Sequence, residues 1–210
     1  MPSTRPRIQF NTAQICNACQ WMEEKQNVDW VSRQEELLKI CDRYRKKSGY
    51  DVIVPYSGGK NGAYIAYKLK NDFGMNPLCV TIRPPMEDPV GEQNIKNFIA
   101  KGYSHMFVSP DPLVERVLDK HEFINKGIPM HAFMIAVQTA ILRVAVSMSI
   151  PFVMFAEEGE SEYGGSTDLK NSPTYDIDFG KKYYLSGTDP NKFKTIYPNL
   201  NGARNEKREI

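Results

Sequence analysis

The sequence lacks several features that would place it in a specialised class of protein. No apolar run approaches the roughly 20 residues that cross a bilayer, and the N-terminal MPSTRPRIQF lacks the apolar stretch of a signal peptide. Four cysteines in 210 residues do not suggest a disulfide scaffold. The three histidines are too few and too scattered to predict a metal centre built from histidine. We therefore expect a cytoplasmic protein without a membrane span.

Neither sign of charge dominates the chain. Lysine and arginine total 27 against 25 acidic residues, which gives a net charge of +2. This balance gives no general reason to expect nucleic acid or a membrane surface as a partner. Apolar residues, in contrast, are plentiful at 41%, which is enough to bury a core. The length favours one domain with a small appendage.

Apolar runs alternate with amphipathic segments between residues 50 and 156. The predicted strands cover residues 51–56, 77–82, 105–109 and 151–156, and the predicted helices cover residues 32–48, 61–73, 91–101, 113–126 and 130–149. This alternation is typical of βαβ units around a parallel sheet, and strands without a polar face indicate a sheet covered on both sides. The predicted fold class is α/β, with a doubly wound parallel sheet of at least four strands.

The segment YDVIVPYSGGKNGAY, residues 50–64, places a glycine pair between a buried strand and a helix. Glycine lets the backbone turn tightly and approach a ligand closely. The start of the helix presents unpaired N–H groups and a partial positive charge, which together bind phosphate. Ser57 adds a hydroxyl and Lys60 a cation. The alternative is a tight turn without a ligand. Neither the dinucleotide fingerprint nor the P-loop pattern is present.

The loop resembles the PP-loop of ATP pyrophosphatases, whose pattern is S-G-G-x-D-S. Ser57, Gly58, Gly59 and Lys60 match the first four positions, whereas Asn61 stands in place of Asp and Gly62 in place of Ser. Enzymes of this superfamily split ATP into AMP and pyrophosphate. They adenylate a substrate oxygen, and a nitrogen or sulfur nucleophile then displaces AMP.

A wider resemblance runs from Met1 to about Pro190. The segments MPSTRPRI, CNAC, YSGGK, TIRPP, NIKNFIAKGY and SEYGG resemble, in this order, the N-acetyl sugar amidotransferase family. The resemblance implies a PP-loop domain of the adenine nucleotide alpha hydrolase-like type over residues 49–190. It also implies a Cys-containing segment and helix over residues 1–48, and a tail or truncated segment over residues 191–210.

The activity that this resemblance implies is an ATP-dependent conversion of an acetamido group to an acetamidino group. Family members act on sugars of bacterial surface polysaccharides, including pseudaminic and legionaminic acids and diacetamido uronic acids. AMP is transferred to the amide oxygen, and ammonia then displaces it. The implied cofactors are ATP and Mg²⁺. The implied partners are a nucleotide- or carrier-linked N-acetylated sugar and glutaminase and cyclase-like subunits that supply ammonia.

The resemblance also implies site residues. Lys60, Asn61 and Glu158 would be catalytic. The nucleotide would be bound by Tyr56, Ser57, Gly58, Gly59, Lys60, Asn61, Gly62, Thr81, Ile82 and Arg83, and the sugar by Glu160, Glu162, Tyr163, Gly164 and Gly165. Clustered carboxylates from Glu157 onward could hold Mg²⁺ or orient the sugar. By their residue types alone, Arg83 could instead be a loop cation, the glutamates a solvated acidic loop, and the glycine pair a turn. His131 is interpreted as a core or cap residue rather than a base.

Three departures from the family pattern bear on function. Asn61 lacks the charge of Asp, so we expect it to weaken the chemical step more than binding, and Gly62 lacks a hydroxyl. Cys16 and Cys19 are half of a tetrahedral Zn²⁺ site, but the family's second cysteine pair precedes the segment that matches Met1. Two free thiols are therefore the alternative. The family also extends further at its C-terminal end.

These departures leave a second function open, a catalytically reduced nucleotide-binding or subunit-docking module on the same fold. PP-loop enzymes that modify tRNA are less favoured, because the chain shows no basic stripe with interleaved aromatic residues. The basic cluster at residues 43–47 is more typical of a solvated helix end.

Overall fold

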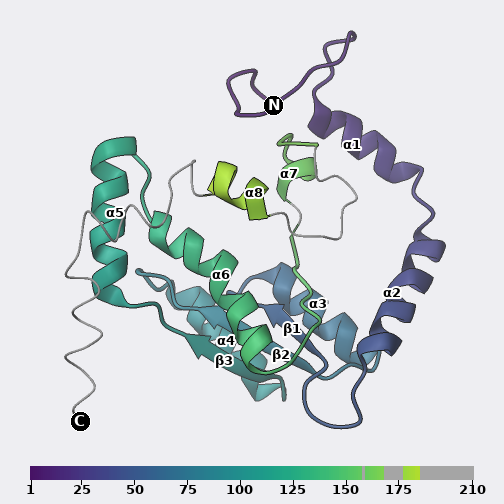
Figure 1. The fold of residues 1–210 in the computed structure, drawn as a ribbon. Coiled ribbons are helices and arrows are strands. Elements are labelled where there is room, and N and C mark those ends of the chain that lie inside the picture. Colours follow the sequence, from purple (N-terminus) through teal and green to yellow (C-terminus); the bar gives the residue numbers. More distant parts are fainter. Residues whose placement is uncertain (158, 168–176, 185–210) are drawn as a thin grey trace.

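A computed structural model describes residues 1–157, 159–167 and 177–184 (Figure 1). Glu158 and the expected tail over residues 191–210 lie outside the described residues. The elements follow the order α1 (Asn17–Gln26), α2 (Trp30–Tyr44), β1 (Val52–Pro55), α3 (Lys60–Asn71), β2 (Pro77–Ile82), α4 (Pro89–Ala100), β3 (Ser104–Val108), α5 (Pro112–Lys126), α6 (His131–Ser147), α7 (Gly159–Glu162), α8 (Ile177–Phe179) and the π-helical turn η1 (Gly180–Tyr184).

The sheet is parallel, with the order β1-β2-β3. The segment predicted as a fourth strand, residues 151–156, contributes a single parallel bridge between Val153 and Ile53. The Ile53 amide donates to the Phe152 carbonyl and the Ile53 carbonyl accepts from Met154, each at 2.9 Å. The next rung would need an N–H at Pro55, which proline does not have. The prediction of four full strands is therefore wrong, because the ladder on this side of β1 ends after one rung.

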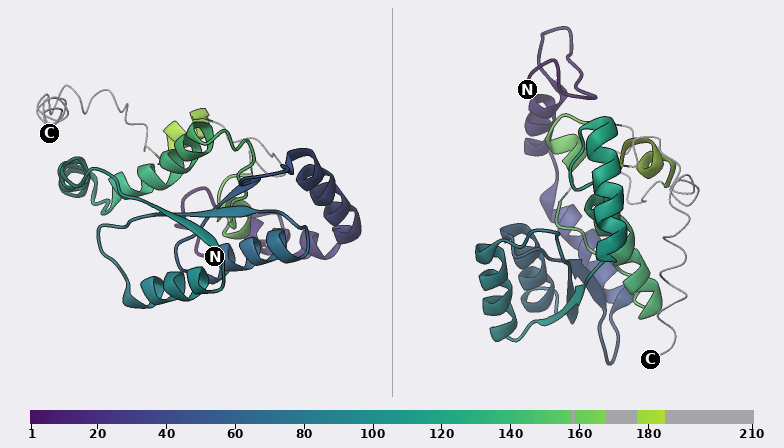
Figure 2. Two further views of the ribbon diagram at one scale, coloured as in Figure 1. Left: turned by 90° about the horizontal axis from the view of Figure 1, so that it is seen from below. Right: turned by 90° about the vertical axis from the view of Figure 1, so that its left-hand side faces the viewer.

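Alternate strand residues face two apolar layers, one on each side of the sheet. Val52, Val54 and Cys79 pack with residues of α2, α3 and α4, whereas Ile53 and Val80 pack with residues of α6. Figure 2 shows the sheet between α3 and α4 on one side and α6 on the other. The predicted α/β class with a parallel sheet covered on both faces is confirmed.

Aspartate side chains start three of the helices. Asp29 accepts hydrogen bonds from backbone amides in the first turn of α2. Asp88 and Asp111 cap α4 and α5 in the same way, and both are followed by a proline at the first helical position. The prediction extended α2 to residue 48, but the helix ends at Tyr44. Arg45 leaves it in an extended conformation, and its guanidinium group donates to the carbonyls of residues 73 and 74.

The N-terminal residues and α1 lie beside α7 and away from the sheet (Figure 1). Sequence analysis did not predict α1. In the part of the chain that the structure describes, every helix is too short or too polar to cross a bilayer.

Candidate functional site

The loop between β1 and α3 lies at the carboxyl edge of the sheet. Gly59 is the N-cap of α3, so it has no side chain to satisfy the first amides, and the first turn contains no acidic residue. These amides can therefore serve an external anion. Ser57 and Lys60 are exposed beside them. Among the described residues, the Lys60 ammonium group has no carboxylate within ion-pair distance.

Gly58 is the position where the loop requires glycine. Its φ of +84° is left-handed, and a Cβ there would lie 2.8 Å from the Cα of Gly91 at the start of α4. The Asn94 side chain of α4 donates to the Gly58 carbonyl at 2.9 Å. α4 thus fixes the loop by close packing and by a hydrogen bond. Asn94 lies in the segment NIKNFIAKGY, whose sequence alone gives this residue no role.

Gly62 is packed against the end of β1. It is buried in the first turn of α3, and a Cβ there would lie 2.8 Å from the Pro55 carbonyl oxygen and 3.0 Å from the Tyr56 ring. Position 62 therefore faces the end of β1. A side chain at position 62 would meet the strand, so glycine fits this close packing, and its effect on phosphate binding stays a prediction.

Asn61 contacts a residue far away in the sequence. Its side-chain amide donates to a carboxylate oxygen of Glu157 at 3.0 Å. Glu157 is exposed and follows the segment that bridges to β1. The structure thus brings one member of the predicted acidic cluster to the loop. Glu158, the predicted catalytic carboxylate, lies outside the described residues.

Tyr56 and Thr81 brace the strand ends below the loop. The Tyr56 ring is buried against Phe98, with ring centroids 4.6 Å apart, and burial raises the pKa of its hydroxyl. The Thr81 hydroxyl donates to the Tyr56 carbonyl and lies 2.8 Å from Nε2 of His105. These buried side chains support the loop from the ends of β1 and β2.

His105 is a supporting residue that sequence reasoning missed. Because the single Thr81 proton goes to Tyr56, Nε2 of His105 donates to the Thr81 oxygen, and Nδ1 carries no proton. Nδ1 is buried and has no hydrogen-bond partner in the described chain. Burial lowers the pKa of His105 below 6.5, so the neutral ring is the form that fits this position.

Arg83 follows the buried end of β2, Ile82. Its guanidinium group pairs with Glu87 at 2.7 Å and lies 4.5 Å from the centroid of the Phe107 ring. These contacts favour the alternative of a loop cation over a dedicated nucleotide contact.

The predicted sugar-binding carboxylates are paired with the N-terminal segment. Glu160 accepts two hydrogen bonds from Arg7, at 2.7 and 3.1 Å, and a third from the Ser166 amide at 2.7 Å. Glu162 pairs with Lys25 at 2.9 Å. Both carboxylates are engaged by cations about 140 to 150 residues earlier in the chain, and the role of Glu160 and Glu162 toward a sugar stays a prediction.

The glycine pair of the same loop also serves contacts within the chain. Gly164 has a φ of +75°, and a Cβ there would lie 2.5 Å from the Ile8 side chain. At Gly165 a Cβ would lie 2.8 Å from the Glu160 carboxyl carbon. The absence of a Cβ at these two glycines thus lets the side chains of Ile8 and Glu160 pack directly against their backbone. Tyr163, which follows α7 and precedes this glycine pair in the sequence, is half exposed.

The cysteine pair does not form a zinc site in the described chain. Cys16 is buried at the start of α1, Cys19 is exposed in the first turn, and both are free thiols. The Cys19 backbone amide lowers the pKa of Cys16 to about 7. No group of three or more His, Cys, Asp or Glu side chains lies together among the described residues. Zn²⁺ needs four ligands, of which this pair could supply two, so the half zinc site stays a prediction.

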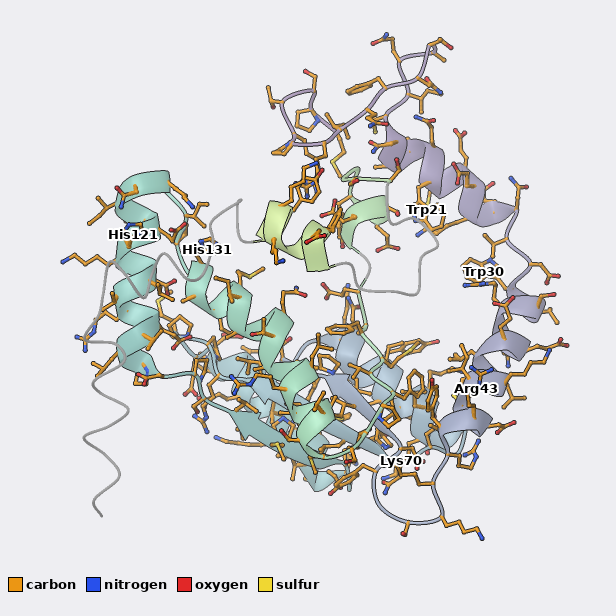
Figure 3. The ribbon with its side chains drawn as sticks, in the orientation of Figure 1. Trp21, Trp30, Arg43, Lys70, His121 and His131 are labelled. Atoms are coloured by element: carbon orange, nitrogen blue, oxygen red, sulfur yellow. The ribbon has the colours of Figure 1, made fainter. Side chains whose placement is uncertain are left out.

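His131 is buried at the start of α6, where Nδ1 lies 2.8 Å from a carboxylate oxygen of Glu122 on α5. Figure 3 shows His121 and His131 near this junction, at the adjoining ends of α5 and α6. The interpretation of His131 as a core or cap residue is confirmed.

The chain matches no protein-family model and no curated protein. Similar solved structures include a predicted subunit of tRNA methyltransferase from Methanocaldococcus jannaschii, with 18% identity and a TM-score of 0.41 over 64% of this chain and 62% of that one. An NH3-dependent NAD synthetase from Campylobacter jejuni has 13% identity and a TM-score of 0.45 over 87% and 99%. An NMN synthetase from Francisella tularensis has 17% identity and a TM-score of 0.40 over 59% and 50%.

Two of the three matches span less than two thirds of the neighbour's own length. Identities this low and TM-scores below 0.5 assign no activity, so the function of this chain is argued from its own residues.

Proposed function

We propose that the chain is an ATP-dependent ligase of the amidotransferase kind. The observation that carries the proposal is the glycine loop at the carboxyl edge of the sheet. Its backbone turns through the left-handed Gly58, and it leaves the first amides of α3 without a side-chain cap. A parallel sheet places ligands at this edge, and such a helix start favours phosphate.

The loop residues have complementary roles toward a triphosphate. The amides at the start of α3 and the Ser57 hydroxyl would donate hydrogen bonds to phosphate oxygens, and Lys60 would add a positive charge. The Glu157 carboxylate beside Asn61 is an oxygen ligand of the kind that suits Mg²⁺, which proteins often hold with one or two carboxylates and substrate phosphates. Mg²⁺ would neutralise part of the phosphate charge. The site therefore fits a nucleotide with its metal.

The reaction that we propose activates an amide. An amide carbon is a poor electrophile, so its oxygen must become a leaving group before ammonia can attack. Transfer of AMP to the acetamido oxygen of an N-acetylated sugar releases pyrophosphate. Attack of ammonia then releases AMP and leaves an acetamidino group. The protein would contribute mainly positioning and stabilisation of phosphate charge.

The sugar and the source of ammonia belong to the same proposal. The half-exposed ring of Tyr163 offers an apolar surface on which a sugar face could stack. Glu160 and Glu162 would act indirectly, because their bonds to Arg7 and Lys25 hold this loop against the N-terminal segment. We propose that glutaminase and cyclase-like subunits supply the ammonia. An ammonium salt can replace these subunits in a test.

The first test measures ATP binding by calorimetry in the presence of Mg²⁺. Lys60→Ala should weaken binding about tenfold or more, because a charge-assisted contact to phosphate is lost, and Ser57→Ala should weaken it less. Lys39→Ala removes an exposed lysine from α2 and serves as the control. Unchanged affinity in both loop variants would show that the loop is only a turn.

The second test separates an enzyme from a module that only binds nucleotide. AMP and pyrophosphate are followed with ATP, Mg²⁺, an N-acetylated sugar nucleotide and an ammonium salt. Formation of AMP that depends on both the sugar and ammonium supports the amidotransferase. ATP binding without any AMP formation would favour the catalytically reduced module.

A further inference from the structure

The hydrogen bond between Asn61 and Glu157 joins the glycine loop to the end of the bridging segment. The Asn61 amide nitrogen lies 3.0 Å from Oε1 of Glu157, and the two residues are 96 positions apart. Asn61 belongs to the first turn of α3, beside Lys60. Glu157 follows a segment whose backbone is held by the bridge to Ile53. The backbone of Asn61 belongs to a helix, and the backbone that leads to Glu157 is hydrogen-bonded to β1.

This contact changes how the substitution at position 61 is understood. The loop pattern has Asp there, and the chain has an amide of nearly the same shape without the charge. The amide uses its N–H to hold a carboxylate that comes from another part of the fold. A carboxylate therefore lies beside the loop, although it comes from Glu157 and not from position 61.

We propose that Glu157 provides the metal-facing carboxylate that the PP-loop pattern places at position 61, and that Asn61 is the positioning residue that holds Glu157 there. This inference rests on the proposed function. It concerns the Mg²⁺ that accompanies ATP, and it makes Asn61 and Glu157 one functional unit. Asn61 is then part of an intact site instead of a defect in it.

The chemistry of the two side chains supports this assignment. One oxygen of Glu157 accepts the amide hydrogen bond, which leaves its second oxygen and the Asn61 side-chain oxygen as ligands of the hard type that Mg²⁺ prefers. An aspartate at position 61 would instead place two carboxylate oxygens opposite each other across this short distance. Like charges so close repel each other. Asn at 61 and Glu at 157 therefore attract each other even without a metal, whereas two acids at these positions would need a cation between them.

The experiment exchanges the charge between the two positions. ATP affinity is measured by calorimetry with and without Mg²⁺ for the parent chain, for E157Q, for N61A and for the double variant N61D/E157Q. E36Q is the matched control, since it removes one exposed carboxylate of α2 that pairs with Arg33. Asn61 and Glu157 are not buried, so the variants should fold, which their melting temperatures would verify.

The expected result is a loss and a recovery of the Mg²⁺ effect. E157Q should reduce the gain in ATP affinity on adding Mg²⁺ about tenfold, since close charged contacts contribute at least this much. N61A should cause a smaller loss, because the carboxylate stays but is no longer held. N61D/E157Q should recover the gain to within about threefold of the parent, and E36Q should match the parent.

Two results would overturn the inference while leaving the proposed function intact. The first is a parent chain that binds ATP with a Mg²⁺ effect that E157Q does not reduce. The second is a double variant that binds no better than E157Q. A parent chain without any ATP binding would instead contradict the proposed function, and with it this inference.

Discussion

At the residue scale, neighbouring loop glycines have different reasons to be glycine. Gly58 has a left-handed backbone and lies against Gly91 with no room for a Cβ. Gly59 has a φ of −87°, which any residue can adopt, and a Cβ there would meet nothing nearer than the Ser57 hydroxyl at 3.5 Å. A sequence pattern presents both as equal members of a Gly-Gly pair.

This difference predicts losses of different size for two similar substitutions. Gly58→Ala should lower the free energy of unfolding by about 1–3 kcal/mol, because it combines a strained backbone with a steric contact, and it should also weaken ATP binding. Gly59→Ala should lower it by less than about 1 kcal/mol. Urea denaturation measures both values. Equal losses in the two variants would contradict the assigned roles.

At the element scale, the junction between α5 and α6 is organised around a buried acid. Glu122 is 1% exposed, and it contacts His121 at 3.3 Å, Lys126 at 2.9 Å and His131 at 2.8 Å. Burial alone would raise the pKa of Glu122, but the hydrogen bonds from Lys126, His131 and His121 outweigh it, and the pKa is lowered from 4.5. Asp119 adds a cap by accepting from the Ala132 amide at 2.7 Å. The two helices therefore meet through charged groups as well as apolar ones.

Removing the central carboxylate should destabilise this junction strongly. Glu122→Ala should cost about 3–5 kcal/mol of unfolding free energy, as expected when one member of a buried ionic cluster is lost. Glu122→Gln keeps the shape and some hydrogen bonds, so it should cost less. Thermal and urea unfolding at pH 7 measure the difference. Losses below about 1 kcal/mol in both variants would show that the cluster contributes little.

The same residue predicts a pH dependence with a definite sign. Because the folded pKa of Glu122 lies below the unfolded value of 4.5, its stabilising effect is complete above about pH 4.5 and is lost as the pH falls through the folded pKa. The urea midpoint of the parent chain should therefore fall more steeply in acid than that of Glu122→Gln. Parallel curves for the two proteins between pH 7 and 3 would contradict this.

At the scale of the whole molecule, the N-terminal segment holds the loop that follows the bridging segment. Arg7 pairs with Glu160, Lys25 pairs with Glu162, and the Asn17 side chain donates to the Gly165 carbonyl at 2.9 Å. These contacts link the beginning of the chain to α7 and residues 159–166. The position of Tyr163, in the middle of this loop, thus depends on residues near the beginning of the sequence.

Breaking the main contact should loosen this loop without unfolding the domain. Arg7→Ala should increase hydrogen exchange of the peptide over residues 159–167 about fivefold, because a partly buried bidentate pair contributes roughly 1 kcal/mol. Arg33→Ala, which breaks an exposed pair on α2, is the control and should leave this peptide unchanged. Protection that is equal in Arg7→Ala and the parent would show that the pair does not hold the loop.

The pattern of apolar residues along the sequence predicted the elements that have a clearly buried face or are buried throughout. It missed elements without such a face. The strand at residues 77–82 was predicted with its observed bounds, because every one of its residues is buried and apolar or nearly so. α1 was missed, since all its residues are at least partly exposed and its amphipathic pattern is weak. The length of the fourth strand was overestimated. Its apolar sequence does not reveal that the partner strand has a proline at position 55, which lacks the N–H needed for the next hydrogen bond.

The sequence by itself determined the class of the fold and the location of the loop. Both follow from local information: the alternation of apolar and amphipathic segments, and a glycine pair between a strand and a helix. Such patterns depend on residues a few positions apart, so they favour the same local structure wherever the segment lies in the fold. The residue types of the loop are therefore the basis on which we predict phosphate binding there.

Only the tertiary structure decided what the loop's neighbours do. The bond from Asn94 to Gly58 spans 36 positions, that from Asn61 to Glu157 spans 96, and that from Arg7 to Glu160 spans 153. A hydrogen bond or ion pair depends on distance in space, and packing of the sheet and its helices sets that distance. For this reason Glu157 lies at the loop, whereas Glu160 and Glu162, only a few residues further along, are paired with the N-terminal segment.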